Sequence, residues 1–359
     1  MGDTEPEVRT VGLIADPGLA HSFADRVCRY LERRLNKLDE YAYSWHVTAD
    51  PLTLPLHESG RVNLDDHIPR LRAKYGWDYI IYLTDGPHYE QNQPVRSVIN
   101  KLQTSATLSI PSLGVATPAS VAKALVEIVR ELATGDPPRS TAFERAFSMR
   151  GRKTDGDESS KINSIEGLRA RLWLIAGMIR SNRPWKLVPQ LSSAMAGAAA
   201  TGAFGVFYTS IWSMADYLSN ARLTLITFSS ITMLSLWLLF HNHLWEKPEG
   251  HRRRERKVVY NVATVLTVTL AATAMYILLF LALLAAALVV IDQEYLSTQL
   301  GHESSLREYL NLAWLAASLG TLGGAIGSSF DDVKLVQRAT FSQREFERRN
   351  LHIDDESDQ

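Results

Sequence analysis

The sequence predicts an N-terminal soluble α/β domain, with a mostly parallel sheet in three layers, followed by a C-terminal all-α transmembrane bundle of four helices. Three observations indicate this fold class. Between residues 8 and 134, short apolar runs alternate with amphipathic helical patterns. Between residues 187 and 330, long apolar runs carry almost no charge. A polar stretch containing Pro and Gly separates the two regions.

Composition divides the chain into five segments. They are a cytosolic α/β domain (1–135), a polar linker (136–163), an interfacial amphipathic helix (164–185), a four-span transmembrane domain (186–332) and a cytosolic C-terminal tail (333–359). The formal net charge of −1 gives no indication of a nucleic-acid partner. A single cysteine, Cys28, excludes an intramolecular disulfide bond.

The N-terminal region contains three apolar runs that read as strands. They are "VRTVGLIA", "AYSWHVTA" and "DYIIYL", and helical patterns follow each of the first two. The segment "SVINKLQTSATLSIPSL" reads as two strands or a hairpin. The last helix has Thr117 as cap, Pro118 at its first position and Gly135 beyond its end. This order predicts the mostly parallel sheet with helices on both faces.

Three aspartates follow the predicted strands, namely Asp16, Asp50 and Asp85. If the strands are parallel, all three lie at the carboxyl edge of the sheet, where open α/β sheets bind ligands. Together they could hold a divalent cation or orient a polar ligand, with nearby polar contacts from Thr84, His88 and Ser109. The alternative is that Asp-Pro and Asp-Gly-Pro open turns, each carboxylate bonding nearby backbone N–H groups. The sequence indicates no cofactor, and a metal remains open.

Common nucleotide and hydrolase motifs are absent from the sequence. There is no G-x-x-x-x-G-K-[ST], and the loop "ADPGLAHS" after the first strand is not G-x-G-x-x-G. There is no G-x-S-x-G elbow either. These motif-defined enzyme classes are therefore not indicated.

The segment "GLRARLWLIAGMIRSNRPWK" is too short and too basic to span a bilayer. We expect it to lie along the cytoplasmic surface, with Trp173 and Trp185 at headgroup depth and Pro184 breaking the helix. Five of its apolar residues fall on one helical face, with arginines around them: Leu168, Leu172, Ile175, Ala176 and Ile179.

Four apolar segments are predicted to span the membrane: 187 to about 215, 223–240, 258–291 and 310–330. The third has 34 uncharged residues without Gly or Pro, which favours one long helix over two short ones. No Asp, Glu, Lys, Arg or His lies inside these segments, which disfavours an ion-coupled transporter.

Charge bias predicts the orientation of these spans. Six Lys or Arg residues lie in the connection between the second and third segments, whereas the connections around 216–222 and 292–308 hold one Arg each. Basic residues also precede the first segment and follow the fourth. The positive-inside rule then predicts a multi-pass plasma (inner) membrane protein with both termini in the cytoplasm.

Small residues recur at every fourth position in the first and fourth apolar segments. Such faces let helix backbones approach closely, either within one chain or between two copies in a homo-oligomer. The residues are Ser193, Gly197, Thr201 and Gly205 in the first segment, and Gly320, Gly324 and Ser328 in the fourth.

Several stretches resemble a family of uncharacterised actinobacterial-type integral membrane proteins with an N-terminal cytosolic α/β domain. They are "SNRPWKLVPQLSSAMAGAAATGAF", "WLLFHNHLWEKP", "YNVATVLTVTLAATAMYILLF", "YLNLAWLAASLGTLGGAIGSSF", "DYIIYLTDGP" and "SIPSLG". The resemblance covers most of the chain. It implies a membrane protein with a cytosolic head and identifies no catalytic residue.

Three functional readings follow from the sequence. The first is a four-span membrane protein, in contact with the lipid bilayer, whose cytosolic head binds a small ligand or partner in a regulatory or scaffolding role. The second is a membrane-tethered enzyme that uses the strand-end carboxylates, with a divalent metal as one option. The third is a transporter or channel.

Overall fold

The computed structural model describes residues 7–37, 43–50, 52, 54–55, 63–90, 93–134, 151–153, 160–164, 167–246, 254–342 and 345–346. The chain forms two compact units. The first, here the N-terminal unit, comprises 1–181 with 249–259 and 341–359; the second, here the helical unit, comprises 182–248 and 260–340.

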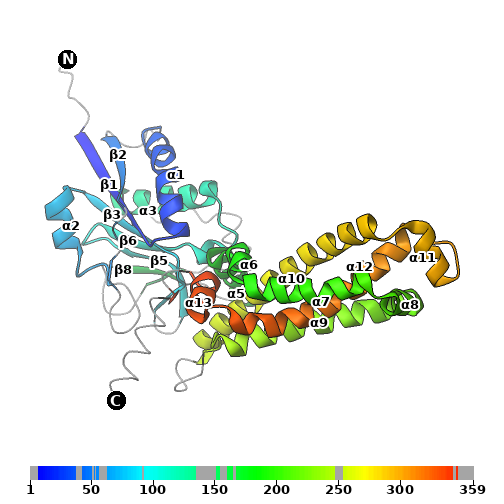
Figure 1. Cartoon of the computed structure of the whole chain (residues 1–359). Coiled ribbons are helices and arrows are strands. Elements are labelled where there is room, and N and C mark those ends of the chain that lie inside the picture. Colours follow the sequence, from blue (N-terminus) through cyan, green and yellow to red (C-terminus); the bar gives the residue numbers. More distant parts are fainter. Residues whose placement is uncertain are drawn as a thin grey trace. The chain divides into compact units, whose positions relative to one another are not determined.

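The N-terminal unit is built on an eight-stranded sheet in the order β2-β1-β3-β6-β5-β8-β7, with β4 paired to β5 (Figure 1). Its elements are β1 (Glu7–Ala15), α1 (Leu19–Leu35), β2 (Tyr43–Asp50), α2 (Ile68–Tyr75), β3 (Tyr79–Thr84), β4 (His88–Glu90), β5 (Gln93–Asn100), β6 (Ser105–Ser109), η1 (Pro111–Leu113), α3 (Pro118–Thr134), β7 (Gly151–Lys153), β8 (Ser160–Ser164) and α5 (Leu168–Asn182).

The sheet is mixed, so the prediction of a mostly parallel sheet is wrong. β2, β1, β3 and β6 are parallel, but β5 runs antiparallel to β6, β4 and β8, and β7 is antiparallel to β8. The hairpin option for "SVINKLQTSATLSIPSL" is the one observed. Its turn is tight: Thr104 has a positive φ of 43°, and its N–H donates to the Lys101 carbonyl. A short turn reverses the chain, whereas a parallel pair needs a long crossover.

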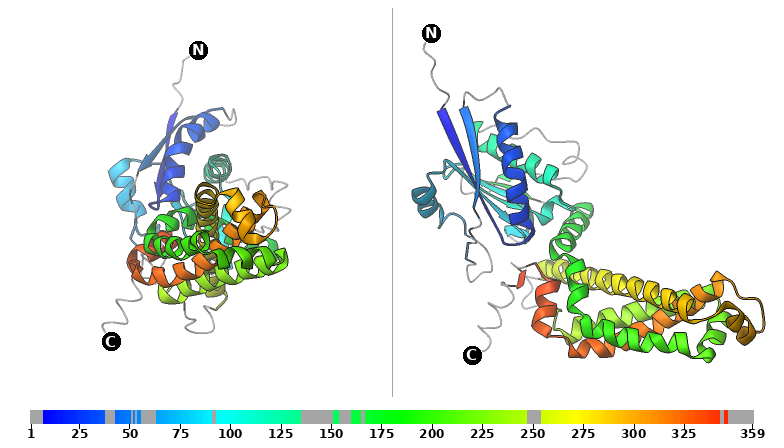
Figure 2. Two further views of the ribbon diagram at one scale, coloured as in Figure 1. Left: turned by 45° about the vertical axis from the view of Figure 1, so that its right-hand side comes forward. Right: turned by 45° about the horizontal axis from the view of Figure 1, so that its top comes forward.

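The three-layer expectation holds around the parallel strands. α1 and α3 pack on one face of the sheet in a core with Leu13, Ile81 and Leu108, and α2 packs on the other face against Ile80 and Tyr82. Figures 1 and 2 show these helices on opposite sides of the sheet. Alternate residues of β3 point to opposite faces, which is why the whole strand is buried.

The outer edge of the sheet at β2 is closed by side chains of α1. Asn36 bonds both backbone groups of Trp45, accepting from its N–H at 2.7 Å and donating to its carbonyl at 3.0 Å. Glu32 accepts from the Val47 N–H at 2.9 Å, and the Cys28 thiol donates to the Val47 carbonyl. Burial raises the pKa of the Cys28 thiol, which keeps it protonated as a donor. This edge is therefore protected from pairing with another strand.

Two strands, β7 and β8, lie inside the segment 136–163 that the sequence predicts as a polar linker. β8 pairs with β5 along Ser160–Ser164 and extends the sheet. Residues 136–150 and 154–159 of this segment lie outside the described residues. A polar strand on an antiparallel sheet needs only one apolar face, so its composition resembles a linker.

Helix α5 covers the part of the chain predicted as an interfacial helix. Its Ala170, Leu174 and Met178 are buried. Trp173 lies against Gly114, where an added Cβ would be 2.0 Å from the indole ring. The ring therefore packs on a glycine of its own unit, and the headgroup depth expected for Trp173 stays a prediction. Trp185 is exposed.

The helical unit contains long helices that run side by side (Figure 2). Its elements are η2 (Pro184–Lys186), α6 (Leu187–Gln190), α7 (Ser192–Phe207), α8 (Thr209–Tyr217), α9 (Asn220–His241), α10 (Arg254–Val290), α11 (Gln293–Leu300), α12 (Leu306–Gly327), η4 (Ser328–Phe330) and α13 (Val333–Thr340).

Among the described residues, three helices are long and apolar enough to cross a membrane, or up to four if the bent pair α7 and α8 counts as one span. The three lie in α9, α10 and α12. The prediction of one long third helix is confirmed, because α10 continues without a break for 37 residues, ~56 Å. The four-helix count is supported only if the bent pair is included.

The first predicted span is broken rather than continuous. α7 and α8 meet at an angle of 85°, with Tyr208 in an extended conformation between them. The break removes a helical partner from the last carbonyls of α7, and the Trp212 indole N–H donates to one of them, that of Gly205, at 3.0 Å. α7 alone has 16 residues, ~24 Å, which is shorter than a ~30 Å bilayer core.

The chain after the fourth apolar segment folds back onto the helical unit. Val336 and Thr340 of α13 are fully buried, so the start of the predicted tail 333–359 is part of this unit. The Asp331 carboxylate accepts from the backbone N–H groups of Ser193 and Ala194, at 2.9 and 3.3 Å. It thus caps the N-terminus of α7 from the other end of the unit's sequence. Residues 347–359 lie outside the described residues.

Candidate functional site

The carboxyl edge of the parallel strands brings together most of the predicted site residues. β1, β3 and β6 are neighbours in the sheet, and Asp16, Asp85 and Ser109 lie at their ends. Asp50 is the last residue of β2, which pairs only with β1 among the described strands. Asp16 and Asp85 are almost completely buried.

The Asp85 carboxylate caps helix α1. Its two oxygens accept from the backbone N–H groups of Leu19 and Ala20, each at 2.8 Å. Gly18 permits this approach: its φ is 119°, and a Cβ there would lie 2.7 Å from an Asp85 oxygen. A helix N-terminus at this edge is where many α/β proteins bind a phosphate. Here the protein's own carboxylate occupies that position.

The Asp16 carboxylate holds the neighbouring loop. One oxygen accepts a short hydrogen bond from the Tyr82 hydroxyl, and the other accepts from the Asp85 backbone N–H at 3.0 Å. The Asp16 backbone N–H in turn donates to the Leu83 carbonyl. The two buried aspartates are therefore coupled through the backbone of residue 85, and both orient the loop that begins α1.

Three of the other predicted residues hydrogen-bond to backbone groups of nearby turns. Asp50 accepts from the Leu52 N–H two residues on, which is the turn-opening geometry given as the alternative reading. Thr84 accepts from the Gly86 N–H at 3.1 Å, and Ser109 donates to the Gly86 carbonyl at 3.0 Å. His88 lies in β4 opposite Val95.

Within the part of the chain that the structure describes, no group of three or more His, Cys, Asp and Glu side chains is placed to hold a metal ion. The observed hydrogen bonds give each strand-end aspartate an architectural task. The arrangement can position the α1 loop and fix its entry angle.

The small-residue faces of α7 and α12 meet each other within the chain. A Cβ at Gly320 would lie 2.6 Å from the Ala198 carbonyl, and one at Gly324 would lie 3.0 Å from that of Ala194. A Cβ at Gly197 of α7 would lie 3.1 Å from the Gly323 carbonyl oxygen and 3.2 Å from the Gly327 Cα. Thr201 and Gly205 also belong to this contact, through Gly323 and Ala316.

A cluster of uncharged polar groups joins three helices of the helical unit. The Thr227 hydroxyl of α9 lies 3.1 Å from both the Tyr276 hydroxyl of α10 and the Ser318 hydroxyl of α12. It also accepts from the Trp314 indole N–H at 2.7 Å. Such hydrogen bonds hold helices together where lipid offers no competing partner. Sequence reasoning missed this cluster, because its members are 38 or more residues apart along the chain except on α12 itself.

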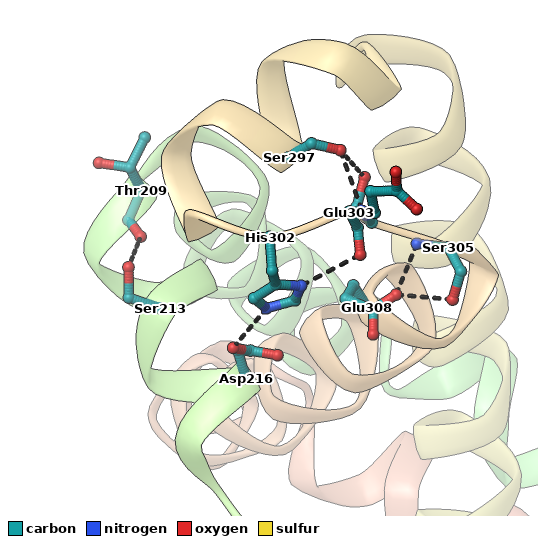
Figure 3. A network of polar contacts seen from close by, with 9 residues as sticks. Thr209, Ser213, Asp216, Ser297, His302, Glu303, Ser305 and Glu308 are labelled. Carbon is teal, nitrogen blue, oxygen red and sulfur yellow. Dashed lines mark hydrogen bonds and ion pairs between the residues drawn. The ribbon is translucent and has the colours of Figure 1, made fainter.

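A second polar network lies at the loop between α11 and α12 (Figure 3). The His302 ring bonds the Asp216 carboxylate of α8 at 2.9 Å and lies 3.0 Å from the Glu303 carbonyl. The hydrogen bond to Asp216 is the main cause that raises the pKa of His302. Nearby, Ser305 and Glu308 form a capping box that begins α12. The S-x-x-E spacing signals the box in the sequence, but no local signal connects residues 216 and 302.

Comparison of this chain with protein-family models, with curated proteins and with solved structures finds no match.

Proposed function

We propose that this chain is a multi-pass plasma-membrane protein whose N-terminal unit lies in the cytoplasm and serves a regulatory or scaffolding role, binding a small ligand or a partner protein. One observation carries the membrane part of the proposal. Many large apolar side chains of the helical unit point outward, as in Phe228 (67% exposed) and Val289 (85% exposed), whereas the close contact between α7 and α12 is made by Ala, Gly and Thr. That distribution suits a hydrocarbon solvent.

The orientation follows from charge. The connection between α9 and α10 is rich in Lys and Arg, and those between α8 and α9 and between α10 and α12 are not. The positive-inside rule then favours cytoplasmic termini.

The regulatory role is favoured over an enzyme by the strand-end aspartates. Asp16 and Asp85, the residues that would form the catalytic edge, have their carboxylates bonded to the protein's own backbone and to Tyr82. A homo-oligomer would use a surface other than the small-residue faces, because α7 and α12 cover those faces mutually.

The membrane topology can be tested with single cysteines, since Cys28 is the only one in the chain. In a Cys28→Ser background, Tyr30→Cys reports on α1 and Thr298→Cys on α11; both side chains are exposed. A membrane-impermeant maleimide applied to intact cells is expected to label the cysteine at 298 and to reach the one at 30 only after lysis. The opposite pattern would refute the proposed orientation.

The role of the N-terminal unit can be tested by thermal shift of the full chain in detergent, against metabolites, nucleotides, Mg²⁺, Ca²⁺ and Mn²⁺. A fragment 1–135 would lack β8 and α5, so the full chain is the better sample. A ligand that binds the folded state raises the melting temperature. We expect any shift to persist in Asp16→Asn. A metal-dependent shift that Asp16→Asn abolishes would favour the membrane-tethered enzyme instead.

A further inference from the structure

Helix α5 has two different faces, and the inner one is fixed to the N-terminal unit. Gly177 packs so closely on η1 that an added Cβ would lie 2.0 Å from the Pro111 carbonyl oxygen. Leu174 and Met178 on the same face are buried. α5 is therefore a rigid extension of this unit and moves with η1.

The outer face of α5 carries an apolar stripe. At 100° per residue, Leu172, Ile175, Ala176 and Ile179 fall on the side opposite Leu174. Leu172 is 59% exposed, and the other three are partly exposed. A stripe of this kind left uncovered by its own unit marks a contact surface.

Exposed arginines lie along both borders of that stripe. Arg171 lies on one border, and Arg169 and Arg180 lie on the other, all with exposed side chains. No acidic residue occurs in α5, "LRARLWLIAGMIRSN". An apolar stripe between two cationic borders is the pattern of a helix that lies in a membrane interface, with aliphatic stems along the acyl boundary and guanidinium groups at lipid phosphates.

The position of α5 in the chain favours a lipid surface over a protein partner. The apolar segment that begins at Leu187 follows only a few residues after Asn182, the last residue of α5. The outer face is therefore tethered close to where the chain enters the proposed membrane. A polybasic border so near a bilayer is attracted to anionic lipid headgroups.

We propose that the outer face of α5 docks on the anionic phospholipid surface of the membrane and thereby holds the N-terminal unit against it. The inference rests on the proposed membrane location of the helical unit. The apolar stripe inserts at the acyl boundary, and the three arginines bind lipid phosphates. Because Gly177 and Trp173 lock the inner face to η1 and Gly114, the lipid composition of the membrane sets the position of the whole unit.

Spin labels on single cysteines test this proposal in the full chain, reconstituted into vesicles in a Cys28→Ser background. Leu172→Cys reports on the stripe. Leu102→Cys is the matched control, because Leu102 is a 79% exposed leucine of the same unit in the β5–β6 turn. Accessibility to oxygen, which concentrates in lipid, is compared with accessibility to a water-soluble nickel chelate.

In vesicles containing phosphatidylglycerol, we expect the label at 172 to favour oxygen and the label at 102 to favour the nickel chelate. In pure phosphatidylcholine, the oxygen preference at 172 should fall. In the variant Arg169→Gln/Arg171→Gln/Arg180→Gln, the oxygen preference of the label at 172 should be low in both kinds of vesicle. A label at 172 that is as open to nickel as the one at 102 would overturn the proposal, as would a preference independent of lipid charge.

Two further readouts separate the remaining outcomes. Protection of the label at 172 from both reagents, or spin–spin broadening between copies, would assign the face to a protein partner and overturn lipid docking. A third label, Phe228→Cys on α9, tests the membrane location by itself. If the label at 228 contacts lipid and the one at 172 does not, only the docking fails; if neither contacts lipid, the proposed membrane function fails as well.

Discussion

The two units differ in how many large apolar side chains they leave exposed. The N-terminal unit buries its bulky residues, among them Tyr82, Ile80 and Leu13, and exposes few of them. The helical unit also buries large residues such as Leu279 and Leu312, but it brings helices closest at Ala198, Gly202 and Ala316 and exposes many more large residues, among them Phe228 and Val289. In α12, the most enclosed of the three long apolar helices, 56% of an 18-residue apolar stretch is buried. In α10 the corresponding share is 28%.

With the helical unit in the membrane, as proposed above, this difference indicates what stabilises each unit. In water, burying a large apolar side chain is the main favourable term, so the N-terminal unit places such residues inside. In lipid, the same burial gains little, and helices associate through close backbone packing and uncharged hydrogen bonds. The glycine contacts of α7 with α12 and the Thr227 cluster are contacts of this second kind.

The largest effect that we expect tests the architectural role of Asp85. Asp85→Ala leaves the buried N–H groups of Leu19 and Ala20 without their acceptor, which should lower the free energy of unfolding by about 4 kcal/mol, since each buried unsatisfied donor costs ~1–3 kcal/mol. Thermal or urea unfolding of the N-terminal unit, followed by near-UV circular dichroism, measures this loss. Asp50→Ala is the matched control and should cost about 1 kcal/mol, because Asp50 is half-buried and bonds one N–H. Equal effects of the two variants would contradict this assignment.

A matched pair of charge insertions tests the solvent of each unit directly. Phe228→Arg on α9 should reduce membrane insertion by about 3 kcal/mol, the cost of an Arg at the centre of a spanning helix. Leu102→Arg replaces an even more exposed apolar residue of the N-terminal unit and should change stability by less than ~0.5 kcal/mol. Alkali extraction of membranes and expression level report the first effect. If Phe228→Arg is as harmless as Leu102→Arg, the outward face of α9 lies in water.

The packing of α7 on α12 gives a smaller effect. Gly320→Ala places a methyl group 2.6 Å from the Ala198 carbonyl, so the helices must separate, at a cost of about 2 kcal/mol. Ile326→Val on the outward side of α12 should lie within ~0.5 kcal/mol of the parent. Thermal unfolding in detergent ranks the two variants, and a reversed order would show that α7 and α12 separate at no cost.

The smallest effect concerns the pair formed by His302 and Asp216. The folded state raises the pKa of His302 above its ordinary value of 6.5, so the stabilisation by this pair is complete below about pH 6.5 and is lost as the pH rises through the raised pKa. The helical unit should therefore melt at a slightly higher temperature at pH 5.5 than at pH 8.5, relative to Asp216→Asn. An unchanged pH dependence in Asp216→Asn would rule out this contribution.

The sequence by itself determined which solvent each half of the chain suits. Uncharged runs such as 258–291 leave few options except a long apolar helix, and without Gly or Pro nothing in that run could end it. Alternating strand and helix patterns likewise determined the parallel part of the sheet. These features depend on residues close together in the chain, and local periodicity records them.

Only the tertiary structure determined the features that depend on contacts between residues far apart in the sequence. The direction of β8, the bend at Tyr208 and the cap that Asp331 places on α7 each involve a partner that no local pattern specifies. The same holds for the strand-end aspartates: the sequence brought Asp16 and Asp85 to one edge, but only the fold brought the N-terminus of α1 onto Asp85. A carboxylate at a strand end is equally suited to bind a ligand or to cap a helix. Its role depends on which donor groups the folded chain places beside it.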